Sequence, residues 1–182
     1  MKIITISLLL MFISTTTNAQ VTITDYDTCQ YLQQYDGEWR YTNGNDTIRI
    51  YLRYHRTANT TYYSTTTTTI TDRLWGWHEY KRGNIVIESN YQNRLLALPS
   101  ENDFNPMFSS ILLGLPNCAD TSKRLIGFIT DYLQQKEWHD VKASLDATKT
   151  IMTWHQERGT SLNDPFAGMG MTLPSNFILI KQ

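Results

Sequence analysis

The sequence has almost no excess of charge of either sign. Its 182 residues contain 16 lysines and arginines against 17 aspartates and glutamates. A general nucleic-acid-binding surface requires an excess of basic side chains, which this composition lacks. The same balance argues against a polybasic surface that holds a protein to a membrane. We therefore expect no nucleic-acid partner.

Several enzyme motifs are also missing. The chain has no Gly-x-Ser-x-Gly elbow, no phosphate-binding glycine loop, no His-Glu-x-x-His and no Cys-x-x-Cys. The two carboxylates of a glycosidase need no proximity in the sequence, so a glycosidase-type hydrolase stays as a remote alternative. The sequence favours a protein that is not an enzyme and that uses no metal and no cofactor.

Long hydrophobic runs are absent except near the start. Lys2 precedes an apolar stretch over residues 3–13, and Thr17-Asn18-Ala19 follows with the small residues that signal peptidase reads. The stretch is shorter than the ~20 apolar residues of a membrane-spanning helix. This pattern predicts a signal peptide over residues 1–19 and export to the periplasm or the extracellular space. A mature domain over residues 20–182, without a transmembrane segment, would follow.

Cysteine is scarce, with Cys29 and Cys118 as the two examples. In an oxidising compartment such a pair is a candidate disulfide. It would close a loop of about 90 residues and stabilise the fold by roughly 4 kcal/mol on the chain-entropy account. The alternative is two unrelated buried thiols.

Alternating apolar and polar residues predict strands along most of the mature chain. In the segment Thr47 to His55, apolar side chains fall on one face, and Arg49, Tyr51, Arg53 and His55 share the other. That second face is either an anion-binding patch or, as we favour, a solvated sheet face. The threonine-rich stretch over residues 57–71 is either an edge strand or a loop. The other expected strands are Glu38–Thr42, Arg73–Tyr80, Ile85–Asn90, Lys123–Thr130, Glu137–Leu145, Lys149–Glu157 and Asn176–Lys181.

These strands follow one another in hairpins, without the strand-helix rhythm of a Rossmann fold. Tyr31, Leu32 and Tyr35 lie on one face of a short helix that precedes them. The pattern is typical of an all-β antiparallel barrel or sandwich of about eight or nine strands.

One short motif carries a resemblance to known barrels. Gly37-Glu38-Trp39 is similar to the Gly-x-Trp start of lipocalins and related calycin barrels. This resemblance implies a lipocalin-like barrel in which Trp39 closes one end and a basic side chain, Lys181 or Arg158, packs over its ring. Longer strings, Tyr35 to Thr47, Gly76 to Tyr80, Ile85 to Ser89 and Asn176 to Lys181, resemble a family of small secreted bacterial proteins of unknown function.

Three Trp-His pairs are the most unusual local feature. They are Trp77-His78, Trp138-His139 and Trp154-His155, and Trp75 lies close to the first. Aromatic faces stack on sugars and apolar molecules, so these residues are candidate ligand contacts, with core packing as the alternative for each. Three histidines on neighbouring strands suit zinc, but no ligand spacing supports a metal.

Two functional hypotheses follow from these features. The first is an exported binding module that takes a small hydrophobic or carbohydrate ligand in the barrel mouth. The second is a structural or protein-interaction barrel whose interior is filled by its own side chains. The interior volume distinguishes them, because a ligand needs a cavity of ~300 Å³ or more.

Overall fold

The computed structural model describes residues 20–25, 27, 29–62, 66–98, 109–114, 123–133, 137–158 and 172–182. Within this part of the chain, strands predominate and two short 3-10 helices interrupt them. In chain order the elements are β1 (Gln20–Asp25), η1 (Leu32–Tyr35), β2 (Gly37–Asn43), β3 (Asp46–Tyr62), β4 (Thr66–Arg82), β5 (Ile85–Ser89), η2 (Tyr91–Leu95), β6 (Ile111–Gly114), β7 (Leu125–Asp131), β8 (Glu137–Leu145), β9 (Ile151–Arg158) and β10 (Asn176–Lys181). Neither described helix is long and apolar enough to cross a membrane.

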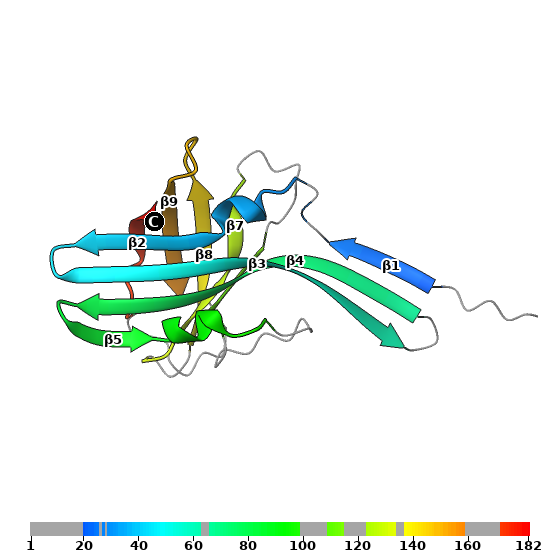
Figure 1. The fold of residues 1–182 in the computed structure, drawn as a ribbon, viewed down its shortest axis with the longest axis horizontal. Coiled ribbons are helices and arrows are strands. Elements are labelled where there is room, and N and C mark those ends of the chain that lie inside the picture. Colours follow the sequence, from blue (N-terminus) through cyan, green and yellow to red (C-terminus); the bar gives the residue numbers. More distant parts are fainter. Residues whose placement is uncertain are drawn as a thin grey trace, which may run out of the picture.

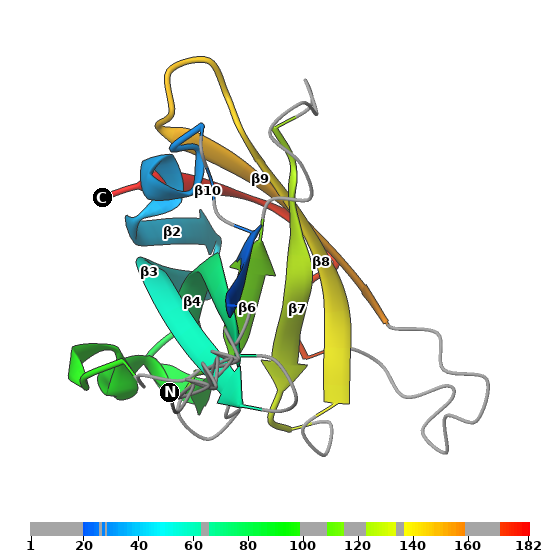
Figure 2. The same cartoon turned by 90° about the vertical axis from the view of Figure 1, so that its right-hand side faces the viewer.

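Eight of the strands form a closed antiparallel barrel. The order is β4-β3-β2-β10-β9-β8-β7-β6, and β6 pairs with β4 to complete the ring. Figure 2 shows β2, β3 and β4 on one side and β6, β7 and β8 on the other, with β9 and β10 between them. The predicted antiparallel barrel is confirmed.

Closure of the ring depends on Gly76 in β4. Gly76 pairs with Ile111 of β6 and with Leu52 of β3. A Cβ atom at this position would lie 2.8 Å from both the Ile111 Cβ and the Leu52 Cδ2 atoms. Only a residue without a side chain lets the three strands approach this closely.

Two strands lie outside the ring. β5 pairs with the end of β4, and β1 pairs in parallel with Thr66–Thr71 at its beginning. The outer halves of β3 and β4 project from the barrel with β1 beside them, as Figure 1 shows. The threonine-rich stretch therefore contributes its described residues to two strands of this arm.

The barrel interior is an apolar core built by the inward residues of every strand. Its side chains have no exposed area at eleven positions, namely Trp39, Ile48, Ile50, Leu52, Leu74, Ile111, Leu113, Leu125, Met152, Trp154 and Leu179. A void that admits water leaves accessible area on the side chains around it. No such void therefore touches these residues.

One end of the barrel is closed by η1 and Trp39. The Trp39 Nε1 atom donates to the Tyr35 carbonyl at 2.8 Å, and Leu32 and Tyr35 of η1 are buried. The Lys181 Nζ atom lies 5.2 Å from the centroid of the Trp39 ring and donates to the Gln34 carbonyl at 3.1 Å. The side chain of Arg158 lies outside the described part.

A second small packed layer covers the outer face of β3 and β4. Trp77 is fully buried there, and the Arg53 guanidinium lies 5.1 Å from the centroid of its ring. Arg53 also donates to the carbonyls of Arg94 and Leu96, which follow β5. Arg49 pairs with Glu38 at 2.9 Å. This face is therefore neither an open anion-binding patch nor simply solvated, because η2 and its arginine contacts cover part of it.

Candidate functional site

The structure separates the residues that the sequence proposed as ligand contacts. His78 and His139 point into the barrel, where their exposed fractions are 0% and 1%. Trp154 points inward, so its neighbour His155 points outward and is half-buried. Trp75 and Trp77 lie on the outer face of β4 and are buried, Trp77 under the second layer. The side chain of Trp138 lies outside the described part.

A network of buried polar side chains surrounds His78 at the end of the barrel opposite Trp39. The His78 Nδ1 atom lies 2.7 Å from Ser110 Oγ, and its Nε2 atom lies 2.6 Å from Glu88 Oε1. In the tautomer with a proton on Nε2, the ring donates to the Glu88 carboxylate. Asn90 Oδ1 accepts from the His78 backbone N–H and from the Ser110 hydroxyl, each at 3.0 Å.

The Ser110 hydroxyl has one proton and several acceptors within reach. If His78 Nδ1 carries no proton, the Ser110 hydroxyl donates to that nitrogen. If His78 Nδ1 is protonated, it donates to Ser110, whose proton then goes to Asn90. The direction of the hydrogen bond between Ser110 and Nδ1 thus depends on the tautomer of the His78 ring.

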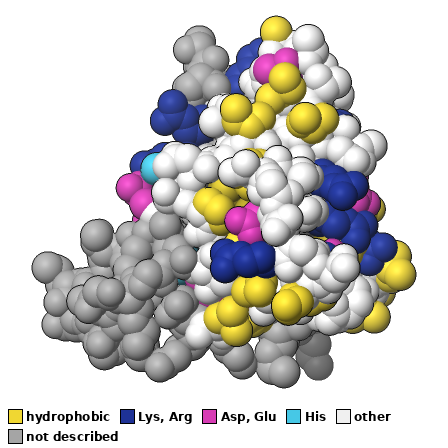
Figure 3. Space-filling view, turned by 90° about the vertical axis from the view of Figure 1, so that its left-hand side faces the viewer, with side chains coloured by type: hydrophobic (Ala, Val, Ile, Leu, Met, Phe, Trp, Pro, Cys, Tyr) yellow, Lys and Arg dark blue, Asp and Glu magenta, His cyan; other side chains and the backbone are white. Residues whose placement is uncertain are grey.

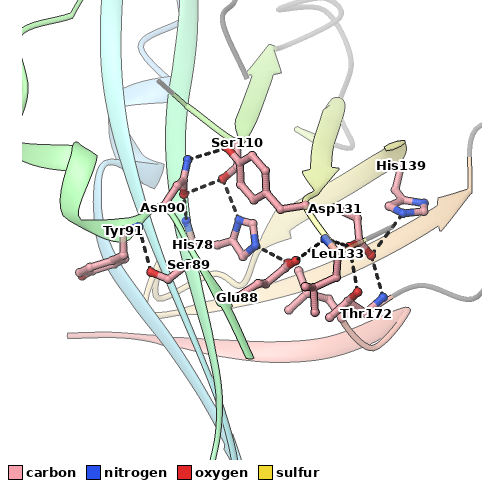
Figure 4. A network of polar contacts seen from close by, with 12 residues as sticks. His78, Glu88, Ser89, Asn90, Tyr91, Ser110, Asp131, Leu133, His139 and Thr172 are labelled. Carbon is pink, nitrogen blue, oxygen red and sulfur yellow. Dashed lines mark hydrogen bonds and ion pairs between the residues drawn. The ribbon is translucent and has the colours of Figure 1, made fainter. Parts of the chain in front are cut away.

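A second carboxylate, Asp131, joins the network through one backbone group. The Leu133 N–H lies 3.3 Å from Glu88 Oε2 and 3.1 Å from Asp131 Oδ1, and so connects the two acids (Figure 4). Asp131 also accepts from the backbone N–H and the hydroxyl of Thr172, at 2.7 and 2.8 Å. These bonds satisfy a carboxylate that is 2% exposed.

His139 lies at the margin of the network. Its Nε2 atom is 3.7 Å from Asp131 Oδ2, which is an ion-pair distance if the ring is protonated. Neither ring nitrogen has a hydrogen-bond partner. The side chain completes the burial of Asp131 without a well-formed hydrogen bond.

The network has the groups of a proton relay, but these side chains are buried. Ser110 and His78 have no exposed area, and Glu88 is 5% exposed. A nucleophile must reach the reacting atom of a substrate, which a hydroxyl without exposed area does not do. Burial raises the pKa of Tyr132 to about 12, so the hydroxyl that accepts from Asn90 Nδ2 stays protonated. We interpret the network as a polar lock that closes this end of the barrel.

Metal coordination is not supported by the described residues. Among them, no three histidine, cysteine, aspartate or glutamate side chains are grouped so that they could hold an ion. The three histidines of the Trp-His pairs do not share a face, because His155 points away from the other two. Successive side chains of a strand point to opposite faces, and this alternation places His155 on the other face from His78 and His139.

A solvent-facing groove lies on the outer face of β8 and β9, beside the beginning of β7. It has a volume of about 240 Å³ and is lined by Arg124, Lys142, Ser144, Thr153 and His155. Lys142 pairs across the strands with His155, and Ser144 pairs with Thr153. The groove therefore gathers two permanent cations, two hydroxyls and an imidazole on one sheet face.

Two acidic side chains lie beside this groove on the same outer face, Glu157 and its cross-strand partner Asp140. Glu157 Oε1 lies 2.7 Å from Lys142 Nζ, and its other oxygen lies 3.8 Å from His155 Nε2. The hydrogen bond and the charge of Lys142 lower the pKa of Glu157, so it is ionised near neutral pH. His155 Nδ1 contacts Asn176 Oδ1 at 2.7 Å, which orients the ring on the groove wall.

The cysteine prediction falls partly outside the described residues. Cys29 is disulfide-bonded, and the described part holds no free cysteine. Cys118 lies outside the described residues, so the pairing with Cys29 stays a prediction.

Sequence reasoning did not find the polar lock or the groove as units. Glu88 and Asp131 lie on β5 and β7, Ser110 directly precedes β6, and no spacing in the sequence links the three residues. The groove residues lie at alternate positions of β8 and β9, which gave a visible pattern of outward polar residues. Their partner Arg124 joins them only through the register of β7 with β8.

Comparison with known proteins places the chain in a family. The chain belongs to a family of unknown function, DUF6705, whose family model matches residues 1–182. No curated protein and no solved structure matches it. Membership assigns neither an activity nor a ligand, so the geometry of the described residues is what points to a function.

Proposed function

We propose that this protein is an exported β-barrel with a packed interior, which binds its ligand at its outer surface. The apolar start of the sequence and the small residues Thr17-Asn18-Ala19 that follow it support export. The proposal follows the filled-barrel alternative for the interior and moves the binding role from the barrel mouth to the outside.

The packing of the interior is the observation that carries the proposal. Trp39, Met152 and Trp154, which come from three different strands, have no exposed area. A lipocalin-type ligand needs a cavity of ~300 Å³ or more lined by such residues, and its wall would be accessible. The absence of accessible area on these side chains favours a barrel filled by its own residues.

The polar end of the barrel supports the same conclusion. A ligand entering opposite Trp39 would meet His78, Glu88 and Asp131, which already satisfy one another and the backbone. Breaking such a buried network leaves polar groups without partners, at a cost of about 1–3 kcal/mol for each group. A ligand that entered here would have to replace these hydrogen bonds.

A neutral apolar fluorescent probe, N-phenyl-1-naphthylamine, tests the proposal. The fluorescence of this probe increases in apolar cavities. Because the probe is neutral, the charged side chains of the outer groove do not attract it. We expect no saturable fluorescence increase with the folded protein. A saturable increase at a single site that vanishes on unfolding would place a cavity in the barrel and contradict the proposal.

A further inference from the structure

We propose that the outer groove and the apolar surface beside it bind a free single-chain anionic amphiphile, such as a medium-chain carboxylate. This inference rests on the proposed function, because it assigns a ligand class to the outer surface. The anionic head would lie in the groove between Arg124 and Lys142. The apolar chain would run over the neighbouring isoleucines of β9 and β10.

The groove supplies donors suited to an oxyanion. Arg124 contributes a planar guanidinium and Lys142 an ammonium that also pairs with Glu157, and both side chains are exposed at the surface. Ser144 and Thr153 add two hydroxyls to the same groove lining. Charge-assisted hydrogen bonds of this kind are shorter and stronger than neutral ones. A carboxylate or phosphate head is the group that this set of donors recognises.

The surface beside the groove is apolar where a solvated sheet face would be polar. Ile178 pairs across the strands with Thr153 of the groove, and Ile180 pairs with Ile151. These three isoleucines are 56%, 56% and 40% exposed. β10 thus presents apolar side chains on both faces, although only the inner face packs against the core. An apolar ligand chain lying over Ile151, Ile178 and Ile180 would explain why these outward side chains are apolar.

Continuity of the two surfaces argues for one molecule with a charged head and an apolar chain. Thr153 lies in the groove and is the cross-strand neighbour of Ile178, so head and chain sites are adjacent. The cations face a hollow of about 240 Å³, which suits one head group better than a flat membrane surface.

Figure 3 shows a comparison surface at the tips of the β2–β3 and β4–β5 hairpins. Hydrophobic side chains also lie beside lysines and arginines there. Ile85 at this end is 68% exposed, and Arg82 is paired with Asp46 at 3.0 Å. Neither residue lines the outer groove. They provide matched control positions for an apolar and a cationic substitution.

Isothermal titration with decanoate below its micelle concentration tests the proposal. We expect saturable binding at one site, weaker binding of the neutral detergent octyl glucoside, and none of acetate. Lys142→Gln and Ile178→Ser should each weaken decanoate binding about tenfold, from the loss of a charge-assisted hydrogen bond or of apolar contact. Arg82→Gln and Ile85→Ser should leave the affinity unchanged.

A gain-of-affinity variant makes the test sharper. Glu157 competes with the ligand head for Lys142, so Glu157→Gln should tighten decanoate binding while octyl glucoside is unaffected. A merely hydrophobic surface would not respond to this change.

Three results would overturn the proposal. The first is equal binding of decanoate and octyl glucoside. The second is an affinity that the groove variants do not change. The third is binding to anionic phospholipid vesicles without binding of free decanoate. If the neutral naphthylamine probe enters the barrel while decanoate still responds to the groove variants, the packed-interior proposal fails and the groove proposal stands.

Discussion

At the residue scale, Trp39 shows how a short motif becomes a structural closure. Gly37 adopts a φ of +117°, and a Cβ atom there would lie 3.5 Å from Lys181 Cε. The turn delivers Trp39 into the barrel end, where its Nε1–H donates to Tyr35 and Lys181 lies over its ring. Burial of the indole is the larger contribution, because a cation–π contact adds only about 0.5–1 kcal/mol.

Replacing Trp39 should therefore be costly. We expect Trp39→Ala to lower the free energy of unfolding by about 3–5 kcal/mol, from lost burial and the cavity left behind. Lys181→Met should lower it by about 1–2 kcal/mol, because the cation–π contact and the hydrogen bond to the Gln34 carbonyl are both lost. Chemical denaturation of the purified variants measures both. A loss below ~1 kcal/mol for Trp39→Ala would show that the indole does not close the barrel.

Residue patterns could identify Trp39 but not the environment of each histidine. His78 and His155 both follow a tryptophan, yet the first is buried in the polar lock and the second lies on the outer groove. Strand parity fixes only that a residue and its neighbour face opposite ways. Which face is covered depends on η2 and on distant strands. Trp77 is buried outside the barrel for this reason.

At the element scale, the β8–β9 hairpin is organised by one carboxylate. Asp146 accepts from the backbone N–H groups of Thr148, Thr150 and Ile151, at 3.2, 3.1 and 2.9 Å. These bonds and that of the Thr148 hydroxyl lower the pKa of Asp146 to about 2. A carboxylate at the start of a tight turn commonly bonds to backbone groups in this way.

The lowered pKa of Asp146 gives a pH-dependent prediction. The folded state favours the carboxylate, so its contribution to stability is present above the ordinary pKa of 3.8 and is lost as the pH falls toward about 2. Asp146→Ala should therefore be less stable than the parent at neutral pH, with the difference shrinking in acid. Side-chain NMR titration reports the pKa directly. A value at 3.8 or above would contradict this account of the turn.

Strand elements were predictable where they formed local hairpins. The expected strand Glu38–Thr42 and the alternation over Thr47–His55 located β2 and the first half of β3. β1 and β6 were missed because they depend on distant partners. β6 has four residues, and it is a strand because β4 and β7 pair with it on both sides. β1 pairs in parallel with residues 66–71, which no local pattern indicates.

At the scale of the whole molecule, the barrel has a packed core, two ends that are closed by different groups, and a polar groove on its outer surface. Trp39 and η1 close one end, and the polar lock around His78 closes the other. The barrel class followed from strand rhythm and the Gly-x-Trp resemblance. The filling of the interior did not, because it depends on how residues from eight strands meet, and composition alone does not determine that.

Unfolding of Ala143→Leu tests the packed interior most directly. Ala143 is 1% exposed and lies between Leu125 and Trp154 on the inner face, while Ser144 beside it points outward into the groove. We predict that Ala143→Leu lowers the free energy of unfolding by about 1–3 kcal/mol, because a filled core has no room for the added atoms. Ser144→Leu, with its longer side chain outside the barrel, should change it by less than ~0.5 kcal/mol. An unchanged or raised stability for Ala143→Leu would reveal unfilled space and contradict the packed barrel.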